Sequence, residues 1–279
     1  MPYLRVRRRW EGSPPYVETK TFFFATDEAE AYARATNESR GSVGWIEEQY
    51  PTTTVSPTTR AVLKALCRVS NGALYLRTGR DQFVMDVEKT VVAVAELQND
   101  WPRETALLDS GAFLKLLDHV DYPLIEFMDD AVIVHSPVGN VVFKNIDASY
   151  LLSVIPPRIP SHDHAAVEWY VSADELSRLL KAVKKLRCSE VIADVRPADG
   201  ESHIELRAQS ASQQTEVSMA WSVPIAAADQ PFQRADRFSA RDITRLPSGG
   251  YHVRLANWKY GVWMNDALPI VFYIRCIEA

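Results

Sequence analysis

The chain has 279 residues, with 31 basic and 36 acidic side chains, and its net charge of -5 means that its average surface repels nucleic acid. A polyanionic partner would therefore need a local patch of positive charge. A hydrophobic content of 47% excludes a disordered chain, and the length favours more than one domain of roughly 100 to 150 residues.

Cysteine usage and hydropathy favour a soluble, intracellular protein. The cysteines Cys67, Cys188 and Cys276 are scattered through apolar patterns without C-x-x-C spacing, which suits a reducing cytosol. The basic run from Arg5 to Arg9 is followed by no apolar segment of a signal peptide. No stretch approaches the length of a membrane span.

Residues 1–51 are predicted to form a small N-terminal ββαβ unit. Its strands are expected at Tyr3 to Trp10, through Phe22 to Phe24 and at Val43 to Glu47, with a helix before the last strand. This unit could dock a partner, extend a wall of the molecule or contact DNA. For its arginines, a solvated strand end is the favoured interpretation over DNA contact: Arg5, Arg7, Arg8 and Arg9.

From residue 52 onward, a short strand runs four times into a capped amphipathic helix. The four segments are "TTTVSPTTRAVLKAL", "TALLDSGAFLKLL", "EWYVSADELSRLL" and "DRFSARDITRL". Each has a cap signal typical of a helix start: Ser56 before Pro57, Ser110 after Asp109, Ser172 with Glu175, and Ser239 with Asp242. The last of these signals is the weakest. After each helix the pattern alternates with period two, which predicts a meander of about three strands.

Two such units make a domain of ordinary size. We therefore expect one domain over residues 52–150 and another over residues 165–279. Between them, residues 151–164 read "LLSVIPPRIPSHDH", whose three prolines favour an extended connector.

The polar faces of these helices concentrate positive charge. The third helix has an apolar stripe of Leu176, Leu179, Leu180, Val183 and Leu186, and the opposite face is almost purely basic: Arg178, Lys181, Lys184, Lys185 and Arg187. The other helices contribute Arg60, Lys64, Arg68, Arg241 and Arg245, and the second helix only Lys115, diluted by Asp118 and His119. A single basic face is usually just solvated, but basic faces at equivalent repeat positions favour contact with a polyanion.

The predicted contacts are independent of base sequence. The chain has no helix-turn-helix and no zinc finger, so its cations would meet phosphates and would not read bases.

The order of these units resembles the DNA sliding clamps, the ring-shaped processivity factors of polymerases, over residues 52–279. Local likenesses to clamp segments occur in "QFVMDVEKTVVAVAEL", "VSADELSRLLKAVKKL" and "YLLSVIPPRIP". The resemblance implies an α+β fold of two sliding-clamp domains, each a pair of strand-helix-meander repeats, plus the N-terminal unit. Because clamp rings contain six such domains, it implies a homotrimer closed by pairing of edge strands, and its mixed local sequence suggests a bacteriophage source.

The resemblance also implies two sets of site residues. The ring lumen would hold duplex DNA through Arg60, Lys64, Arg68, Lys115, Arg178, Lys181, Lys184, Lys185, Arg241 and Arg245. Short peptide motifs of a DNA polymerase and a clamp loader would bind an apolar pocket of Met85, Val91, Val154, Ile155, Pro156, Ile274 and Ile277, residues that could equally be plain core.

Catalysis has little support in the sequence. Asp118, His119 and Asp121 close a helix, where polar residues are ordinary, and the "SHDH" of residues 161–164 lacks further spaced metal ligands. No phosphate-binding glycine loop or hydrolase motif occurs, so we expect no enzyme activity, no metal and no cofactor. The alternatives are a β-rich structural or assembly protein with solvated helices, and an enzyme with a site between the N-terminal unit and the first domain.

Overall fold

The computed structural model describes residues 3–9, 17–23, 45–48, 50–108, 110–136, 139–160, 167–198, 201–210, 216–224, 233–255 and 259–277. In the N-terminal region, β1 (Tyr3–Arg9) lies between β2 (Val17–Phe23) and β3 (Trp45–Glu48) in an antiparallel sheet. These are the three strands expected from the sequence, although β2 begins earlier than predicted. The expected helix before β3 lies outside the described residues.

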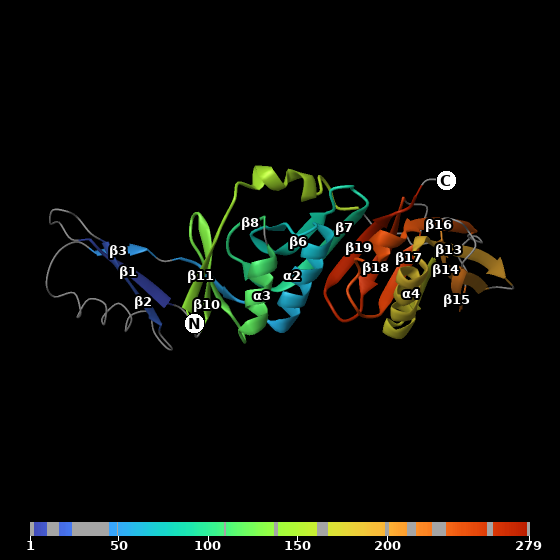
Figure 1. Ribbon diagram of the computed structural model, residues 1–279, viewed down its shortest axis with the longest axis horizontal. Coiled ribbons are helices and arrows are strands. Elements are labelled where there is room, and N and C mark those ends of the chain that lie inside the picture. Colours follow the sequence, from blue (N-terminus) through green and yellow to red (C-terminus); the bar gives the residue numbers. More distant parts are fainter. Residues whose placement is uncertain are drawn as a thin grey trace.

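The strand-helix-meander repeat predicted from the sequence is confirmed four times along the chain (Figure 1). The first pair of units contains β4 (Thr52–Thr54), α2 (Pro57–Val69), β5 (Leu74–Leu76), β6 (Gly79–Met85), β7 (Val91–Trp101), β8 (Thr105–Leu107), α3 (Ser110–His119), β9 (Leu124–Phe127), β10 (Ala131–Ser136) and β11 (Gly139–Lys144). A 3-10 helix, η1 (Ala148–Val154), follows.

The second pair of units repeats this order. It contains β12 (Val167–Val171), α4 (Ala173–Leu186), β13 (Cys188–Ala198), β14 (Glu201–Ser210), β15 (Glu216–Pro224), β16 (Arg234–Ser239), α5 (Ala240–Ile243), β17 (Tyr251–Leu255), β18 (Tyr260–Asn265) and β19 (Ile270–Arg275). Residues 161–166 of the expected connector lie outside the described residues.

Two of the predicted helix caps form as expected. The hydroxyl of Ser56 accepts the N–H of Thr59 at the start of α2, with Pro57 as the first helical residue. At the start of α4 both bonds of the capping box are present, since Ser172 accepts the N–H of Glu175 and the Glu175 carboxylate accepts the N–H of Ser172. These bonds satisfy N–H groups that have no partner inside the helix.

The other two caps differ from the prediction. Ser110 is the first residue of α3, and its hydroxyl bonds across the fold to the Gly72 carbonyl at 2.7 Å. Ser239 makes no side-chain cap, and α5 is a single turn because its last bonds tighten to i to i−3 spacing before Pro247. The fourth basic helix is therefore much shorter than expected.

One antiparallel sheet joins the two halves of the chain, with strand order β12-β17-β18-β19-β7-β6. The pairing of β19 with β7 sets Ile270 opposite Ala95 and Ile274 opposite Val91, so β19 continues the first meander. The other large sheets have the orders β11-β10-β9-β4 and β15-β14-β13-β16. In Figure 1, edge strand β11 lies to the left of α2 and α3, whereas edge strand β15 lies near the right end of the view.

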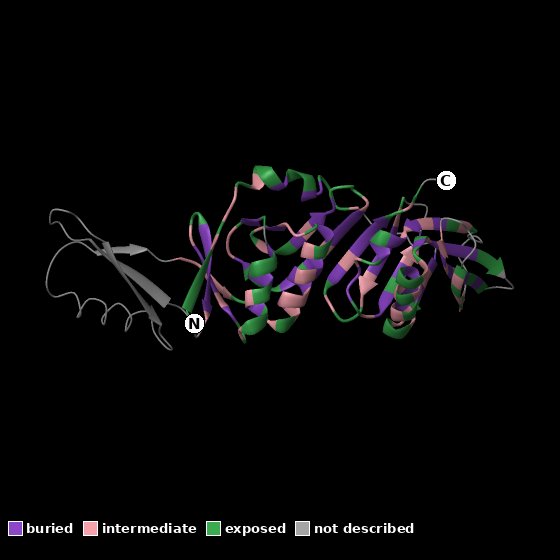
Figure 2. Cartoon of the chain, in the orientation of Figure 1, coloured by how far each residue is buried: buried purple, intermediate pink, exposed green. Residues whose placement is uncertain are grey.

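The core lies between these sheets and the helices, which leave their polar faces outward (Figure 2). Leu66 of α2, Phe113 of α3 and Leu179 of α4 are buried in it, together with one face of the joining sheet. Within the described residues, no helix is both long and apolar enough to cross a lipid bilayer.

Candidate nucleic-acid interface

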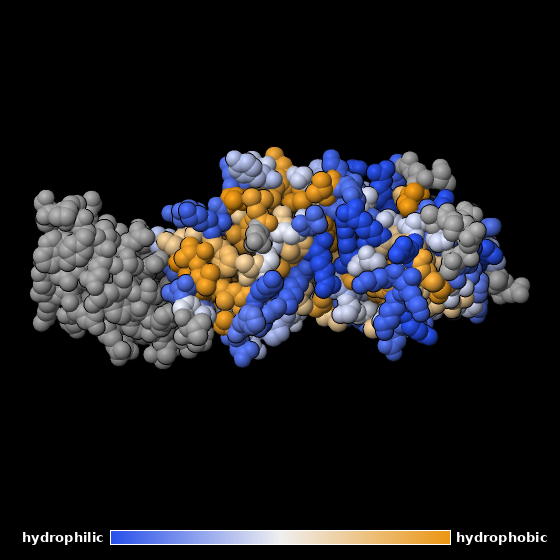
Figure 3. Space-filling view, viewed as in Figure 1, coloured by the Kyte–Doolittle hydropathy of each residue, from blue (hydrophilic) through white to orange (hydrophobic). Residues whose placement is uncertain are grey.

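Helix α4 presents a row of exposed cations. Its stripe of Leu176, Leu179 and Val183 is buried, and this fixes which side of the helix faces out. The basic side chains of the predicted face lie on the outward side, and all are exposed: Arg178, Lys181, Lys184, Lys185 and Arg187. In the part of the chain that the structure describes, none of the five forms an ion pair within 4 Å. The surface over α4 is accordingly hydrophilic (Figure 3).

Local sequence explains why this helix is stable despite its repelling cations. Asp174 and Glu175 lie in the first turn, near the positive end of the helix dipole, and Lys184 and Lys185 lie in the last turn, near the negative end. Burial opposes ionisation of Glu175, but hydrogen bonds from Ser172 outweigh it and lower the pKa of Glu175. The negative charge is thus confined to the beginning of α4, and the rest of the face stays positive.

Helix α2 differs because two of its cations, Arg60 and Lys64, share an ion pair with one carboxylate. Asp118 at the end of α3 pairs with Lys64 at 2.7 Å and with Arg60 at 3.9 Å. The Arg60 side chain is only 13% exposed. Of the remaining predicted residues in the first half, Arg68 and Lys115 are exposed. Sequence reasoning did not identify the neutralising role of Asp118.

Around α5, the predicted cations contact the turn between β6 and β7. Arg241 forms an exposed ion pair with Glu88. Arg245 lies beyond the end of α5 and is 12% exposed, with Asp86 at 2.8 Å and Asp242 at 3.3 Å. Arg245 thus joins the two halves of the chain inside the protein and is poorly placed to reach a partner.

The pKa values of Asp86 and Asp242 in this cluster shift in opposite directions. Burial works against ionisation of Asp86, but N–H donors of Val91 and Thr90 and the Arg245 guanidinium outweigh it and lower its pKa. For Asp242, burial dominates and raises its pKa. Although ligand oxygens of Asp86, Glu88 and Asp242 lie within 4.8 Å of one another, the arginines already pair with them, so the cluster is an ion-pair network between the two halves of the chain.

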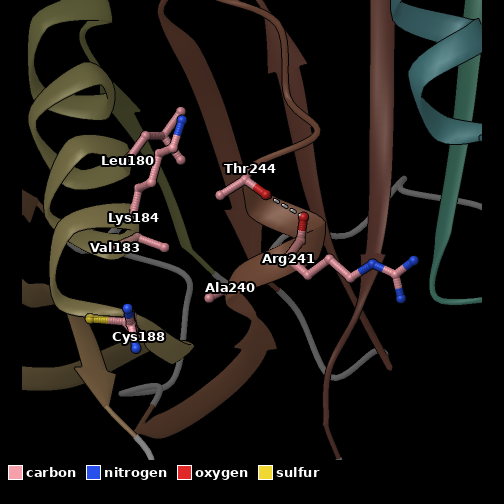
Figure 4. A pocket seen from close by; sticks show the side chains of 8 residues that line it. Leu180, Val183, Lys184, Cys188, Ala240, Arg241 and Thr244 are labelled. Carbon is pink, nitrogen blue, oxygen red and sulfur yellow. Dashed lines mark hydrogen bonds between the residues drawn. The ribbon is translucent and has the colours of Figure 1, made fainter.

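A cavity of about 600 Å³ opens between α4 and α5 (Figure 4). It is lined by Leu180, Val183, Lys184, Arg187, Cys188, Ala240, Arg241 and Thr244. Of its three cations, Lys184 and Arg241 were predicted to contact DNA, whereas Arg187 was not among the predicted contacts. Its position directly after the last residue of α4 was the signal that could have included it.

The structure does not gather the predicted peptide-pocket residues in one place. Val91 and Ile274 are buried in the main core, whereas Met85 is packed on the other face of the joining sheet. A third cluster holds Val154, with Ile155 packed against it. Pro156 is buried, and Ile277 is 39% exposed. Alternation along the strands separates Met85 from Val91 and Ile274, because neighbouring residues of a strand point to opposite faces. Val154 and Ile155 belong to η1 and its C-cap and not to that sheet.

Comparisons with known proteins agree with this architecture. No protein family model matches the chain. A sliding clamp of Vibrio phage KVP40 is 26% identical over 160 residues, which is 56% of this chain and 71% of the phage protein.

Two solved structures share the fold at low sequence identity. Proliferating cellular nuclear antigen from Entamoeba histolytica superposes with a TM-score of 0.59 at 14% identity, over 81% of this chain and 98% of that one. The DNA polymerase III subunit beta sliding clamp of Bartonella birtlesii gives 0.58 at 11% identity, over 100% of this chain and 91% of that one. The chain therefore has the fold of the DNA sliding clamps, and its resemblance to a bacteriophage clamp, predicted from the sequence, is confirmed.

Proposed function

We propose that the protein is a DNA sliding clamp, a processivity factor that encircles duplex DNA and tethers a replicative polymerase. One observation carries the proposal: a chain with the clamp fold and a net charge of -5 presents five cations on α4 without ion pairs among its described residues. A structural or assembly protein with solvated helices has no need for such a separation of charge.

The proposed mechanism is mechanical and contains no catalytic step. Lysines and arginines on the helices would attract phosphates without reading bases, so the clamp could move along the duplex. Closure of the ring would keep the protein on DNA even when these weak contacts exchange. The contacts would come mainly from α4, with Arg68 and Lys115 as weaker contributors, since Arg60, Lys64 and Arg245 pair within the chain.

The ring would be a homotrimer assembled head to tail. Edge strand β11 exposes 40% of Val141 and 57% of Val142, and Figure 3 shows hydrophobic surface near it. Edge strand β15 belongs to a different sheet, so pairing of β11 with β15 of the next copy would use unlike surfaces, as a closed ring requires. The proposed domains are residues 52–150 and 165–279, joined by the connector at 151–164.

Polymerase and clamp loader would bind through short peptide motifs. Of the residues proposed for their pocket, Ile277 and the half-buried Ile155 are accessible, whereas Val91 and Ile274 would act as support beneath the surface. If the protein comes from a phage, it would work in the host cytoplasm.

Two measurements test the proposal. Light scattering should give a mass three times that of the 31.5 kDa chain. After loading, the protein should remain on closed circular DNA during gel filtration and be lost when the circle is cut once. Equal retention on linear and circular DNA would contradict encirclement.

A further inference from the structure

The proposed clamp function gives no role to the three-stranded N-terminal sheet, because the four repeats begin at β4. Its central strand is β1, which lies between β2 and β3 (Figure 1). Successive residues of a strand belong to opposite faces, so Arg5, Arg7 and Arg9 share one face of the sheet, which we call the arginine face. Leu4 and Val6 belong to the other face. Such alternation is typical of a sheet with one packed and one solvated side, and the apolar residues mark the packed side.

The face opposite to the arginine face is electrically balanced. Residues directly opposite each other in an antiparallel pair share a face. Arg8 is opposite Glu18, and Val6 lies between Lys20 and Glu47. The three strands thus give this face two cations and two carboxylates, and we call it the balanced face.

The arginine face has an excess of positive charge. Arg5 lies between Thr21 and Glu48, and Glu48 is the one carboxylate that the three strands place on this face. Arg7 is opposite the uncharged Thr19. The arginines at alternate positions of β1 follow a line, with about 7 Å from one to the next. A line of cations complements a chain of phosphates.

An aromatic pair extends the arginine face at one end. Tyr3 is directly opposite Phe23 in the register, and both belong to the same face as Arg5. Proteins that bind single-stranded nucleic acid combine cations along the backbone with aromatic side chains on which bases stack. The bases of a duplex are already stacked on one another, so the aromatic pair favours a single strand as the ligand.

A short link keeps the N-terminal sheet beside the first clamp domain. Strand β3 ends at Glu48 and β4 begins at Thr52, so residues 49–51 span at most about 10 Å. The Pro51 carbonyl already accepts the N–H of Phe127 at 3.0 Å, next to the pairing of β4 with β9. A strand bound to the arginine face would therefore stay close to the body of the clamp.

We propose that the arginine face of the N-terminal sheet binds single-stranded DNA, as a second nucleic-acid site separate from the helices. Phosphates would follow Arg5, Arg7 and Arg9, and bases would stack on Tyr3 and Phe23. The sequence alone favoured a solvated strand end for these arginines. The division of charge between the two faces, which only the register of the strands reveals, favours binding instead.

The test compares two double variants of the full-length protein that remove equal charge from opposite faces. Arg5→Gln with Arg7→Gln changes the arginine face, and Arg8→Gln with Lys20→Gln changes the balanced face. Binding of each protein to a short labelled oligothymidine is followed by fluorescence anisotropy between about 50 and 200 mM salt. Each cation that neutralises a phosphate of a single strand contributes about 0.7 to the slope of log affinity against log salt. The first variant should therefore reduce the slope by about 1.4, and the second should leave it unchanged.

Two further variants separate binding from folding. Arg5→Lys with Arg7→Lys keeps both charges, so the slope should stay that of the wild-type protein. A slope lost in this variant as well would mean that the sheet is disturbed and would count against phosphate contact. Tyr3→Leu keeps an apolar side chain but removes the ring, and it should weaken binding to the oligothymidine by about tenfold.

Competition with unlabelled DNA identifies the form that the sheet binds. An unlabelled single strand should displace the labelled oligothymidine, and a duplex of the same length should displace it poorly. The inference is overturned if the duplex competes equally well, if both double variants reduce the slope equally, or if the wild-type protein does not bind the oligothymidine at the lowest salt.

The outcomes for this sheet are separate from those for the ring. Arg5→Gln with Arg7→Gln should remain trimeric and stay on closed circular DNA, because ring closure does not involve the arginine face. Failure of the wild-type protein to stay on circles would overturn the proposed clamp function, and the salt slopes of the two double variants would still decide whether the arginine face binds single strands.

Discussion

At the scale of single residues, two arginines near α5 make ion pairs of very different burial. Arg245 pairs with Asp86 where their side chains are 12% and 1% exposed, whereas Arg241 and Glu88 are 59% and 52% exposed. We expect Arg245→Ala to lower the free energy of unfolding by about 3–5 kcal/mol, because it leaves Asp86 buried without its cation. Arg241→Ala is the matched control and should cost much less, because water already screens its exposed pair with Glu88. Chemical denaturation measures both, and equal losses would contradict the assignment of Arg245 to the interior.

The carboxyl groups in the same cluster should respond to pH with opposite signs. The pKa of Asp86 is lowered, so its ionised form stabilises the fold above the ordinary aspartate range near about 4, and this contribution is lost as pH falls through the folded pKa. The pKa of Asp242 is raised, so its contribution is greatest below that range and is lost as pH rises.

Asparagine substitutions measured at several pH values test this sign. Asp86→Asn should lower the free energy of unfolding at pH 7, and the difference from the wild-type protein should become smaller in acid. Asp242→Asn should be neutral or stabilising at pH 7, because it removes a buried charge that is costly to ionise. A large destabilisation by Asp242→Asn at pH 7 would show that its pairing with Arg245 outweighs its burial.

At the scale of elements, the caps give a direct test of what orders α4. Ser172→Ala removes the hydroxyl that accepts the Glu175 N–H, and we expect a cost of about 1 kcal/mol. Ser239 has the equivalent position before α5, where no side-chain cap forms, so Ser239→Ala should lower the free energy of unfolding by less. Thermal unfolding of both variants makes the comparison. A larger loss for Ser239→Ala would mean that its hydroxyl has a role other than capping.

The helix caps also show which features of the fold can be predicted from the sequence. Ser56 and Ser172 mark helix starts through bonds to residues three positions away, so local pattern predicts α2 and α4 well. Ser110 is not a cap because it is the first residue of α3 itself, and its hydroxyl bonds to Gly72, which is distant in sequence. The shortness of α5 goes with the i to i−3 bonds of Arg245 and Leu246 that precede Pro247. The spacing of Ser239 with Asp242 did not reveal that no side-chain cap forms there.

The candidate site, too, could be predicted from the sequence only where it depends on residues that are close in the chain. The outward face of α4 follows from periodicity, because the buried stripe and the basic face belong to one helix. The neutralisation of Lys64 depends on Asp118 from another helix, and the burial of Arg245 depends on Asp86 from the other half of the chain. Neither contact leaves a local pattern. The N-terminal helix expected from the sequence stays a prediction.

At the scale of the whole molecule, the six-stranded sheet makes the two halves one mechanical unit. Backbone pairing of β19 with β7 joins them, and the Asp86–Arg245 pair adds a buried contact between the same halves. A ring assembled from such units would therefore open most easily between chains. The proposed joint at the edge of β11 is then the place where a single substitution has the greatest effect on assembly.

A charged substitution at Val142 tests this prediction directly. It is 57% exposed on β11, so Val142→Asp should leave the folded chain intact while it places an unpaired charge in the proposed joint. We expect the mass measured by light scattering to fall from that of a trimer toward that of one chain, with an unchanged circular dichroism spectrum. Val87→Asp is the control, since Val87 is 59% exposed between β6 and β7, away from both proposed edges, and this variant should stay trimeric. Dissociation by both variants would mean that added charge alone weakens the assembly, and dissociation by neither would remove β11 from the joint.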